Sequence, residues 1–353
     1  MQNKGENTLR EILSQPAVWA DTLKVFDANR DLLMAFWEEG QFDQVIFTGC
    51  GSTFYLSQSA AVIFQKLTGL TSIALPGSEL FLFNDLYLDP RKRTLLLAVS
   101  RSGETTETVR AMQIFKAGGF GKTMTITTVP GSSVTKFADF TLIAEAAQEV
   151  SIAQTRSFAS MLLLAEAMAA QIGGMDATEV LASFPDKVAA LFDCYQTLAQ
   201  SIGEDHSLIK FFFLGSAFNF GVASEAMLKM KEMSLSNPEA FHILEFRHGP
   251  KSMVDENSLV IGLLTESAEH QEMPVLQEMA GLGGKVLTIA EQSNETLASI
   301  GDVVEISSEV IEPLRALLFL PVLQLIAFYR AISNGQDPDN PHNLDAVVHI
   351  PSA

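Results

Sequence analysis

Apolar residues recur along residues 1–38 at the spacing of a helix. The positions that form one stripe, three to four residues apart, are Trp19, Leu23, Phe26, Leu33, Phe36 and Trp37. Beyond this segment, short apolar runs end in Gly, Ser and Thr and alternate with helix-like stretches. This alternation predicts a parallel sheet covered by helices.

The strand pattern occurs twice at a nearly constant offset. "VIFTGCGST" returns as "FFFLGSAFN", so that Gly215 corresponds to Gly49, and "LLLAVSRS" returns as "LVIGLLTES", so that Thr265 corresponds to Ser100. "KTMTITT" and "DFTLIAE" return in the same order as "KVLTIAE" and "DVVEISS". The repetition predicts an internal duplication into two flavodoxin-like α/β halves, each a parallel sheet flanked by helices. We expect four segments along the chain: an N-terminal helical segment at 1–38, the first half at 39–175, the second half at 200–335 and a tail at 336–353.

Composition and charge argue against several classes of protein. A net charge of −19, without a compact run of Lys or Arg, repels nucleic acid and anionic lipid. The N-terminal residues lack the pattern of a signal peptide, and the apolar run at 316–328 is too short to span a bilayer and predicts a buried helix. Cys50 and Cys194 suggest neither a disulfide framework nor a metal cluster. We expect a cytoplasmic protein that binds no nucleic acid, membrane or metal.

The segment "SRSGETTET" joins an apolar strand to a predicted helix. In an open parallel sheet, ligands bind beyond the carboxyl ends of the strands. Hydroxyl donors, the flexible Gly103 and the free N–H groups of a helix N-terminus together suit a phosphate monoester. The alternative is that Ser and Thr only cap the helix. A second turn of this kind, "GCGST", favours anion binding over capping alone.

Two segments of the second half carry candidate acid–base residues. "SEAMLKMKEMS" places Glu225, Lys229 and Glu232 on one face of a helix. The alternative is a solvated surface ion pair, but the flanking Met and Leu residues predict burial, where a carboxylate is costly unless it is used or paired. "EFRHGPK" holds His248 between cations and beside a Gly-Pro turn, which favours a placed proton carrier over an exposed histidine without a role.

These motifs, taken in order, resemble a known family. "GCGSTF", "SRSGETTET" and "AQTRSF" resemble the signature segments of the sugar isomerase (SIS) domain. "EAMLKMKEMS" and "EFRHGPKSMVDENSLV" resemble the second SIS copy in the isomerase module of glucosamine-6-phosphate synthase, and also the amino-sugar-phosphate deaminases. The resemblance covers residues 41–350. It implies a phosphosugar substrate, no metal or organic cofactor, and a homodimer whose sites are shared between subunits.

The resemblance also implies roles for individual residues. Glu232 matches the base that moves a proton between C1 and C2 of the opened sugar, and His248 matches the histidine that helps to open the ring in the partner subunit's site. Lys229 would support catalysis beside Glu232. The residues implied in phosphate and sugar binding are Thr53, Ser100, Arg101, Ser102, Thr105, Gln154 and Glu225.

The chain departs from the synthase pattern in three places. From the start "MQNKGEN" we expect no glutaminase domain before the first helix, and Asp345 and Ala346 occupy the positions of the synthase's tail alanine and imine-forming lysine. Arg101 stands where the synthase has glutamine. We therefore expect an aldose–ketose isomerase of a 6-phosphosugar, coupled to loss of ammonia from an amino sugar phosphate. The alternatives are a fructosamine-6-phosphate deglycase and a phosphosugar sensor without catalysis, and the presence of Glu232 and "RHGP" disfavours the sensor.

Overall fold

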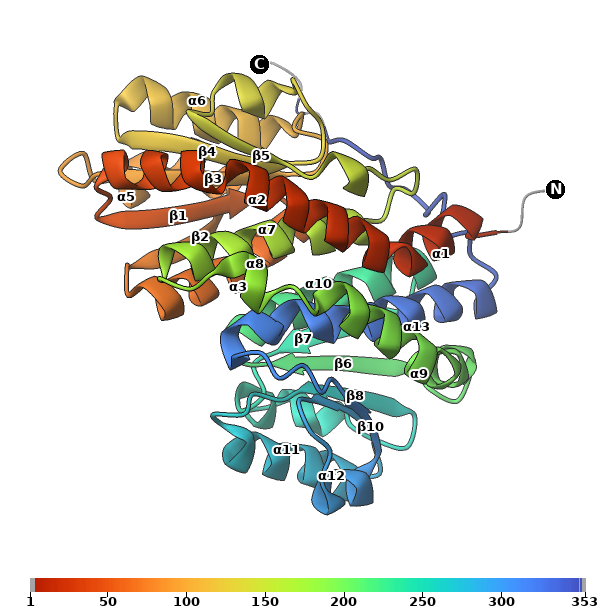
Figure 1. The fold of residues 1–353 in the computed structure, drawn as a ribbon. Helices are drawn as coiled ribbons and strands as arrows, with labels where there is room; N and C mark the ends of the chain where they lie inside the picture. Colours follow the sequence, from red (N-terminus) through yellow and green to blue (C-terminus); the bar gives the residue numbers. More distant parts are fainter. Residues whose placement is uncertain (1–3, 349, 351–353) are drawn as a thin grey trace. The chain divides into compact units, whose positions relative to one another are not determined.

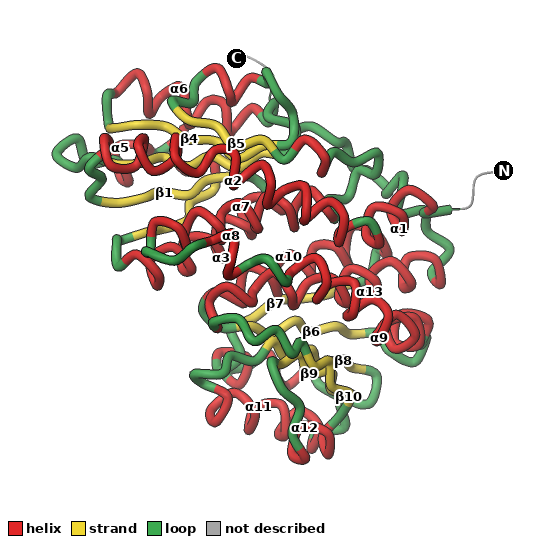
Figure 2. Tube along the Cα trace, in the orientation of Figure 1, coloured by secondary structure: helices red, strands yellow, loops and turns green. Residues whose placement is uncertain are grey.

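Two five-stranded parallel sheets, each covered by helices on both faces, make up the fold in the computed structural model (Figures 1 and 2). The structure describes residues 4–348 and 350, so residues 1–3 of the predicted N-terminal segment and residues 349 and 351–353 of the predicted tail lie outside it. The strand orders are β2-β1-β3-β4-β5 and β10-β9-β8-β6-β7. Read from the other edge, the second order repeats the first, which confirms the predicted duplication and the α/β fold class.

The chain forms two compact units, which we call the first and the second unit. The first unit contains the described residues of Ala17–Glu149, Gln154–Ala182 and Asp345–Ala353, and the second contains those of Met1–Pro16, Val150–Ala153 and Ser183–Leu344. Each unit holds one of the two sheets. A segment of the second unit, residues 150–153, therefore interrupts the sequence of the first.

In the first unit, α3 and α7 pack together on one face of the sheet, and α4 and α6 on the other. β1 and β3 are central strands and are buried along their whole length, because helices cover both faces. The elements of this unit are α2 (Gln15–Gly40), β1 (Gln44–Gly49), α3 (Ser52–Thr68), β2 (Ser72–Pro76), α4 (Gly77–Leu82), α5 (Asn84–Tyr87), β3 (Thr94–Ser100), α6 (Thr106–Gly118), β4 (Gly121–Thr127), η1 (Ser133–Lys136), β5 (Phe140–Ile143), η2 (Glu145–Ala147), α7 (Arg156–Ile172) and α8 (Ala177–Val180).

In the second unit, α10, α13 and α9 cover one face of the sheet, and α11 and α12 the other. The edge strand β7 was not predicted, because Pro238 and Glu239 hide the apolar pattern; proline is tolerated in an edge strand. The elements are α1 (Glu6–Leu13), α9 (Phe184–Glu204), β6 (Lys210–Gly215), α10 (Phe218–Ser234), β7 (Asn237–Phe241), η3 (Glu245–Arg247), η4 (Pro250–Met253), β8 (Ser258–Leu263), α11 (Glu269–Gly281), β9 (Lys285–Ala290), α12 (Glu295–Ile300), β10 (Asp302–Glu305), η5 (Glu312–Phe319) and α13 (Leu320–Ser333).

The helix at the end of the second unit is longer than the sequence predicted. η5 and α13 run without a break over Glu312–Ser333, and by the length of these 22 residues and the composition of their most apolar window they could cross a membrane. The prediction that this segment is too short to span a bilayer was therefore wrong. The prediction of a buried helix is confirmed, because 83% of that window is buried inside the protein, as in the core helix of a globular domain.

The N-terminal helix α1 is fastened to the C-terminal end of the second unit. The Asp339 carboxylate accepts hydrogen bonds from the backbone N–H of Asn7 (3.0 Å) and from the N–H and the hydroxyl of Thr8 (both 2.7 Å). Asp337 accepts another from the N–H of Gly5 (3.0 Å). These carboxylates satisfy the free N–H groups at the start of α1, which the helix itself cannot pair. The single helix predicted over the range 1–38 is thus two helices, α1 and α2.

Candidate active site

The loop after β3, residues 100–105, carries the Ser and Thr hydroxyls for which an anion was predicted, and we call it the hydroxyl loop. The Ser100 hydroxyl oxygen accepts a hydrogen bond from the N–H of Gly103 (3.0 Å), and the Ser102 oxygen accepts one from the N–H of Glu104 (3.2 Å). Thr105 begins α6 but makes no capping hydrogen bond with its side chain. Among the described residues, the O–H groups of these three side chains donate to no acceptor, so they are available as donors to a ligand or to water.

Gly103 is required by the shape of this loop. Its φ is 68°, in the left-handed region that glycine adopts readily, and a Cβ there would lie 2.0 Å from the Ser132 hydroxyl oxygen. The turn therefore depends on glycine for both its backbone angle and its packing.

Arg101, in the same loop, is held by a buried carboxylate. Its Nη1 lies 3.7 Å from Oε2 of Glu149, and the side chains of Arg101 and Glu149 are 12% and 0% exposed. Its Nη2 donates to the carbonyl oxygen of Ala346 (3.2 Å). The Arg101 side chain is therefore largely buried and does not extend into solvent.

Thr53 and Gln154 lie at other turns of the same sheet. Thr53 is buried at the start of α3, where its hydroxyl donates to the Cys50 carbonyl (3.0 Å) and accepts from the Cys50 N–H (2.9 Å), so it already serves as a local cap. Gln154 lies just before the start of α7, and its Oε1 is buried without a hydrogen-bond partner among the described residues. A buried acceptor without a donor is costly and is a feature of ligand sites.

The second unit holds the predicted acid–base residues on α10. The Nζ of Lys229 lies 2.5 Å from Oε2 of Glu232 and 3.3 Å from Oε1 of Glu225. The side chains of Lys229 and Glu225 are 0% exposed, whereas that of Glu232 is 17% exposed. A solvated surface ion pair is thus excluded, and Glu232 is the member of the group that remains in contact with solvent.

Electrostatics keep Lys229 charged in this environment. Burial by itself would lower the pKa of Lys229, but the attraction of Glu225 and Glu232 outweighs it and raises the pKa above the usual value. A protonated Lys229 then compensates a buried carboxylate on one side and holds the Glu232 carboxylate on the other.

His248 lies apart from this group in the contacts that the structure describes. It follows η3 and is exposed, and its backbone N–H donates to the carbonyl of Glu245 (2.9 Å). No hydrogen bond or ion pair joins its ring to the acid–base residues of α10 in the described part of the chain. Exposed Leu244 and Met253 flank it in sequence, 42% and 53% exposed.

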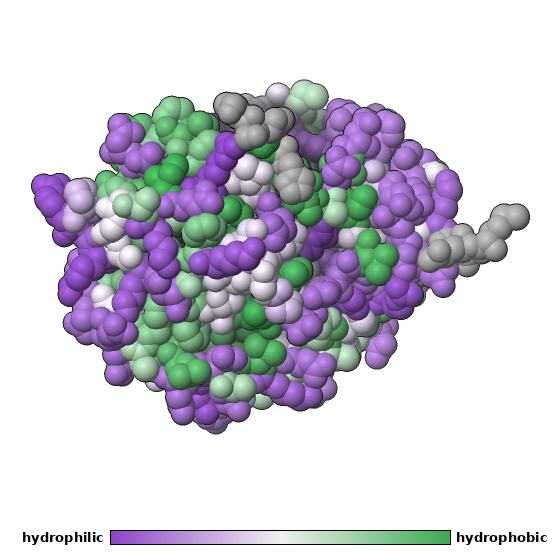
Figure 3. Space-filling view, turned by 90° about the horizontal axis from the view of Figure 1, so that it is seen from above, coloured by the Kyte–Doolittle hydropathy of each residue, from purple (hydrophilic) through white to green (hydrophobic). Residues whose placement is uncertain are grey.

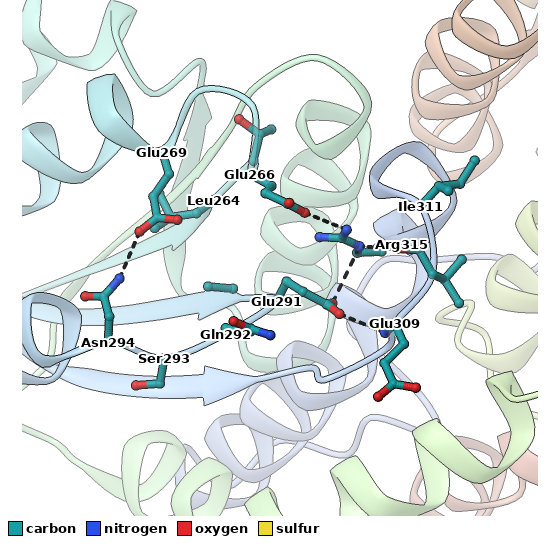
Figure 4. A pocket seen from close by; sticks show the side chains of 13 residues that line it. Leu264, Glu266, Glu269, Glu291, Gln292, Ser293, Asn294, Glu309, Ile311 and Arg315 are labelled. Carbon is teal, nitrogen blue, oxygen red and sulfur yellow. Dashed lines mark hydrogen bonds and ion pairs between the residues drawn. The ribbon is translucent and has the colours of Figure 1, made fainter.

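A cavity of about 500 Å³ opens in the second unit beyond the carboxyl ends of β8 and β9, and Figure 4 shows its lining. Glu266 and Glu291 both face Arg315, with Arg315 Nη2 2.6 Å from Glu266 Oε2 and Nε 3.5 Å from Glu291 Oε2. Glu269 and Glu309 also line it. With four carboxylates against one guanidinium, this cavity repels a phosphate, although it occupies the place where a Rossmann-like sheet often binds one.

No group of three or more His, Cys, Asp or Glu within residues 4–348 and 350 is arranged to hold a metal ion. Both cysteines are free thiols, Cys50 half-buried and Cys194 exposed. Glu149 was not predicted as a site residue, although it stands close to "QTRSF" in the sequence, the segment that contains the start of α7.

Comparisons with known proteins agree with this arrangement. The model of the SIS domain matches the chain twice, at residues 41–171 and 209–333. The glutamine–fructose-6-phosphate aminotransferases (isomerizing) of Methanothermobacter thermautotrophicus and Caldanaerobacter subterraneus are 28% and 29% identical to it, over 97% of this chain and 57% and 58% of theirs. The chain thus spans a little over half the length of these curated relatives.

Two solved structures are similar over nearly their whole length. The tagatose-6-phosphate ketose/aldose isomerase from Escherichia coli has a TM-score of 0.87 at 25% identity, covering 95% of each chain. The glucosamine-6-phosphate deaminase from Thermotoga maritima has a TM-score of 0.77 at 28% identity, covering 97% of this chain and 99% of its own. With two matched domains, two sheets of the same strand order and the motifs in sequence, this chain belongs to the SIS-domain family.

Proposed function

We propose that this protein is an isomerase of 6-phosphosugars that acts on an amino sugar phosphate and releases ammonia. We assign phosphate binding to the hydroxyl loop of the first unit and proton transfer to Glu232 of the second. The relatives named for isomerisation and for deamination of sugar phosphates support this substrate class. We also propose a cytoplasmic location.

The observation that carries the proposal is the Glu225–Lys229–Glu232 group. A buried lysine between two carboxylates costs desolvation energy, which a merely structural role on this helix would avoid with apolar residues. Only Glu232 keeps exposure, at 17% of its side chain, so it is the member able to meet a substrate. Proton abstraction next to a carbonyl needs a carboxylate of this kind near the carbon acid.

The chemistry follows from that base. Glu232 would remove the C2 proton of the open-chain aldehyde, the C2–H electron pair would form the C1=C2 double bond of an enolamine, and the C1 oxygen would take up a proton to become a hydroxyl. Return of the proton to C1, with loss of a proton from nitrogen, gives the 2-imine of the ketose, and water converts this imine into the ketose phosphate and ammonia. A hydroxyl substrate would give the ketose directly, through an enediol. Each route needs proton transfers and, for the imine, one water.

The hydroxyl loop suits the phosphate end of such a substrate. Ser100, Ser102 and Thr105 offer O–H donors, Arg101 adds a positive charge, and α6 supplies the N-terminal end of a 13-residue helix. The protein as a whole carries a charge of −19, so these local donors must provide the attraction for an anion.

We further propose a homodimer in which His248 serves the partner subunit's site, where it would assist ring opening. Its exposure, its lack of contact with the α10 group in the described residues, and the exposed Leu244 and Met253 near it support a role at an interface. Figure 3 draws one face of the molecule, on which hydrophobic and hydrophilic residues are interspersed. Mixing inactive Glu232→Gln and inactive His248→Ala proteins should restore activity in hybrid dimers, and no recovery after verified subunit exchange would contradict the shared site.

A substrate panel tests the proposed function. Hexose, hexosamine and fructosamine 6-phosphates would each be assayed for ketose or aldose product and for ammonia. Ketose phosphate together with ammonia from a hexosamine 6-phosphate supports the proposal. Ketose without ammonia would restrict the activity to isomerisation, and cleavage of the fructosamine alone would identify a deglycase. Binding without turnover of any member would identify a phosphosugar sensor.

A further inference from the structure

Glu149 is a buried carboxylate in the first unit that the proposed reaction does not use. It stands between η2 and α7, and its side chain is 0% exposed. A buried carboxylate is costly unless several donors meet it, so its surroundings show what it holds.

Four groups meet the Glu149 carboxylate. Oε1 accepts hydrogen bonds from the N–H of Thr155 (2.7 Å) and from its hydroxyl (2.6 Å). Oε2 accepts one from the Ser157 hydroxyl and lies 3.7 Å from Nη1 of Arg101. One carboxylate therefore joins the start of α7 to the hydroxyl loop, two segments that lie far apart in the sequence.

The second unit contains the counterpart of this residue. Glu312 corresponds to Glu149 at the same offset that relates the sequence segment "DVVEISS" to "DFTLIAE", and its Oε1 accepts from the N–H (2.9 Å) and the hydroxyl (3.2 Å) of Ser267. Ser267 is itself the counterpart of Ser102 in the hydroxyl loop. In both units, then, a glutamate contacts the loop after the third strand: Glu149 lies before α7, and Glu312 is the first residue of η5. Within the described residues, only the first unit has a cation as that partner in the loop.

We propose that Glu149 is a positioning residue for phosphosugar binding, which fixes the Arg101 guanidinium in the hydroxyl loop so that its charge acts on the substrate phosphate. The inference rests on the proposed function for its ligand. An arginine held by a buried carboxylate loses little further side-chain freedom when it meets an anion, so pre-ordering favours binding. The same carboxylate is also an N-terminal cap of α7, a purely structural role from which the test must separate it.

The test is a double-mutant cycle of Glu149→Gln with Arg101→Gln. Glutamine at 149 can still accept from Thr155 through its amide oxygen, but it cannot pair with a guanidinium. We expect Glu149→Gln to raise the dissociation constant of fructose 6-phosphate in calorimetry, and the KM of any substrate found, by about tenfold, with kcat within about twofold. Because Glu149 is proposed to act through Arg101, removing Glu149 should have no further effect once Arg101 is gone. The double variant should therefore bind no more weakly than Arg101→Gln alone.

Two further variants serve as controls for this test. Glu312→Gln removes the counterpart in the second unit and should leave the affinity within about twofold of the wild type. Glu149→Asp retains the negative charge but places it one methylene further from Arg101, so it should recover part of the affinity. This variant also tests the inference if the glutamine variant does not fold. Circular dichroism and thermal unfolding check the fold of each variant.

The outcomes separate this inference from the proposed function. Unchanged binding by Glu149→Gln, or losses that simply multiply in the double variant, would reduce Glu149 to a cap of α7. A wild type that binds fructose 6-phosphate but turns over no panel member would refute the isomerase while the cycle still decides the role of Glu149. A wild type that binds neither fructose 6-phosphate nor inorganic phosphate would overturn both.

Discussion

The loops that follow β3 and β8 have the same origin and opposite character. In the first unit, residues 100–105 combine hydroxyls with Arg101 and the left-handed Gly103. In the second unit, Glu266 stands in the place of Arg101, and Ala268 (φ −122°) in the place of Gly103. The second loop has lost both the charge and the backbone shape for holding a phosphate, and its cavity is lined by carboxylates (Figure 4).

The helices after β1 and β6 differ in the reverse sense. α10 carries Glu225, Lys229 and Glu232, whereas the corresponding positions of α3 are Ser59, Ile63 and Lys66. The first unit thus has a loop suited to anions but no acid–base group on its helix, and the second has the acid–base group but not the loop. A duplication allows such a divergence, because each copy can change independently of the other.

The largest expected effect comes from removing the base on α10. Glu232→Gln keeps size and hydrogen bonding but removes the proton acceptor, so turnover should fall by about 10²–10⁴-fold. Exchange of the C2 proton with solvent deuterium, followed by NMR, should stop as well. Because the hydroxyl loop is untouched, affinity for fructose 6-phosphate should remain. A variant that exchanges this proton at the wild-type rate would refute the assignment of Glu232.

A pair of serine variants compares the two loops directly. Ser102→Ala removes a donor to a charged group and should weaken phosphosugar binding by about 1.5–3 kcal/mol, roughly 10- to 150-fold. Ser267→Ala, its counterpart, should leave affinity unchanged, because Ser267 donates to Glu312. Calorimetry on both variants measures the contrast, and equal losses would mean that the hydroxyl loop has no special role.

The turns that open α3 and α10 offer a smaller contrast in stability. Gly51 (φ 57°) and Ala217 (φ 48°) occupy equivalent places with nearly the same backbone, but only glycine adopts it without strain. Ala217→Gly should raise the free energy of unfolding by about 0.5–2 kcal/mol. This is the net effect of removing the backbone strain of Ala217 and of the greater conformational entropy that glycine gives the unfolded chain. Gly51→Ala should lower it by a similar amount through backbone strain alone, since a Cβ there meets no atom within 4 Å. Chemical denaturation measures both changes, and effects of the same sign would contradict the comparison.

The smallest effect concerns Glu272, which is buried in the second unit. Burial raises the pKa of Glu272, although its hydrogen bonds with Ser216 and Thr265 oppose this. A carboxyl whose pKa is higher in the folded than in the unfolded state contributes stability at low pH, and this is lost as the pH rises through the folded pKa. In the wild type, the free energy of unfolding should therefore fall as the pH rises from the unfolded pKa of 4.5 through the folded pKa of Glu272. Glu272→Gln should remove this fall and raise the free energy of unfolding slightly at pH 7. Denaturation curves of both proteins from pH 4 to 8 measure this. If the charged form of Glu272 stabilised the fold, the free energy of unfolding of the wild type would rise with pH relative to that of the variant.

Sequence patterns predicted what depends on local periodicity. The duplicated strands, the helical face of Glu225, Lys229 and Glu232, and their burial all follow from residue spacing and apolar neighbours. Contacts between distant segments did not follow, because no local pattern encodes them. The pairing of Glu149 with Arg101 needs the three-dimensional arrangement of two loops, and the local cap formed by Thr53 looks in sequence like any hydroxyl of an anion site.

The attachment of α1 to Asp339 has a consequence for synthesis in the cell. Thr8 and Asp339 are 331 residues apart in sequence, and a ribosome that adds about 5–20 residues per second needs roughly 17–66 s to cover that distance. During this interval the sheet of the first unit, which is complete by Ile143, can assemble, whereas α1 must wait without its carboxylate partners and without α13. Ile12 of α1, which is buried in the folded protein, is without α13 for that time. Nascent chains of this protein therefore pass through a stage in which α1 depends on residues that are not yet made. During this stage α1 is accessible to chaperones that recognise short apolar segments.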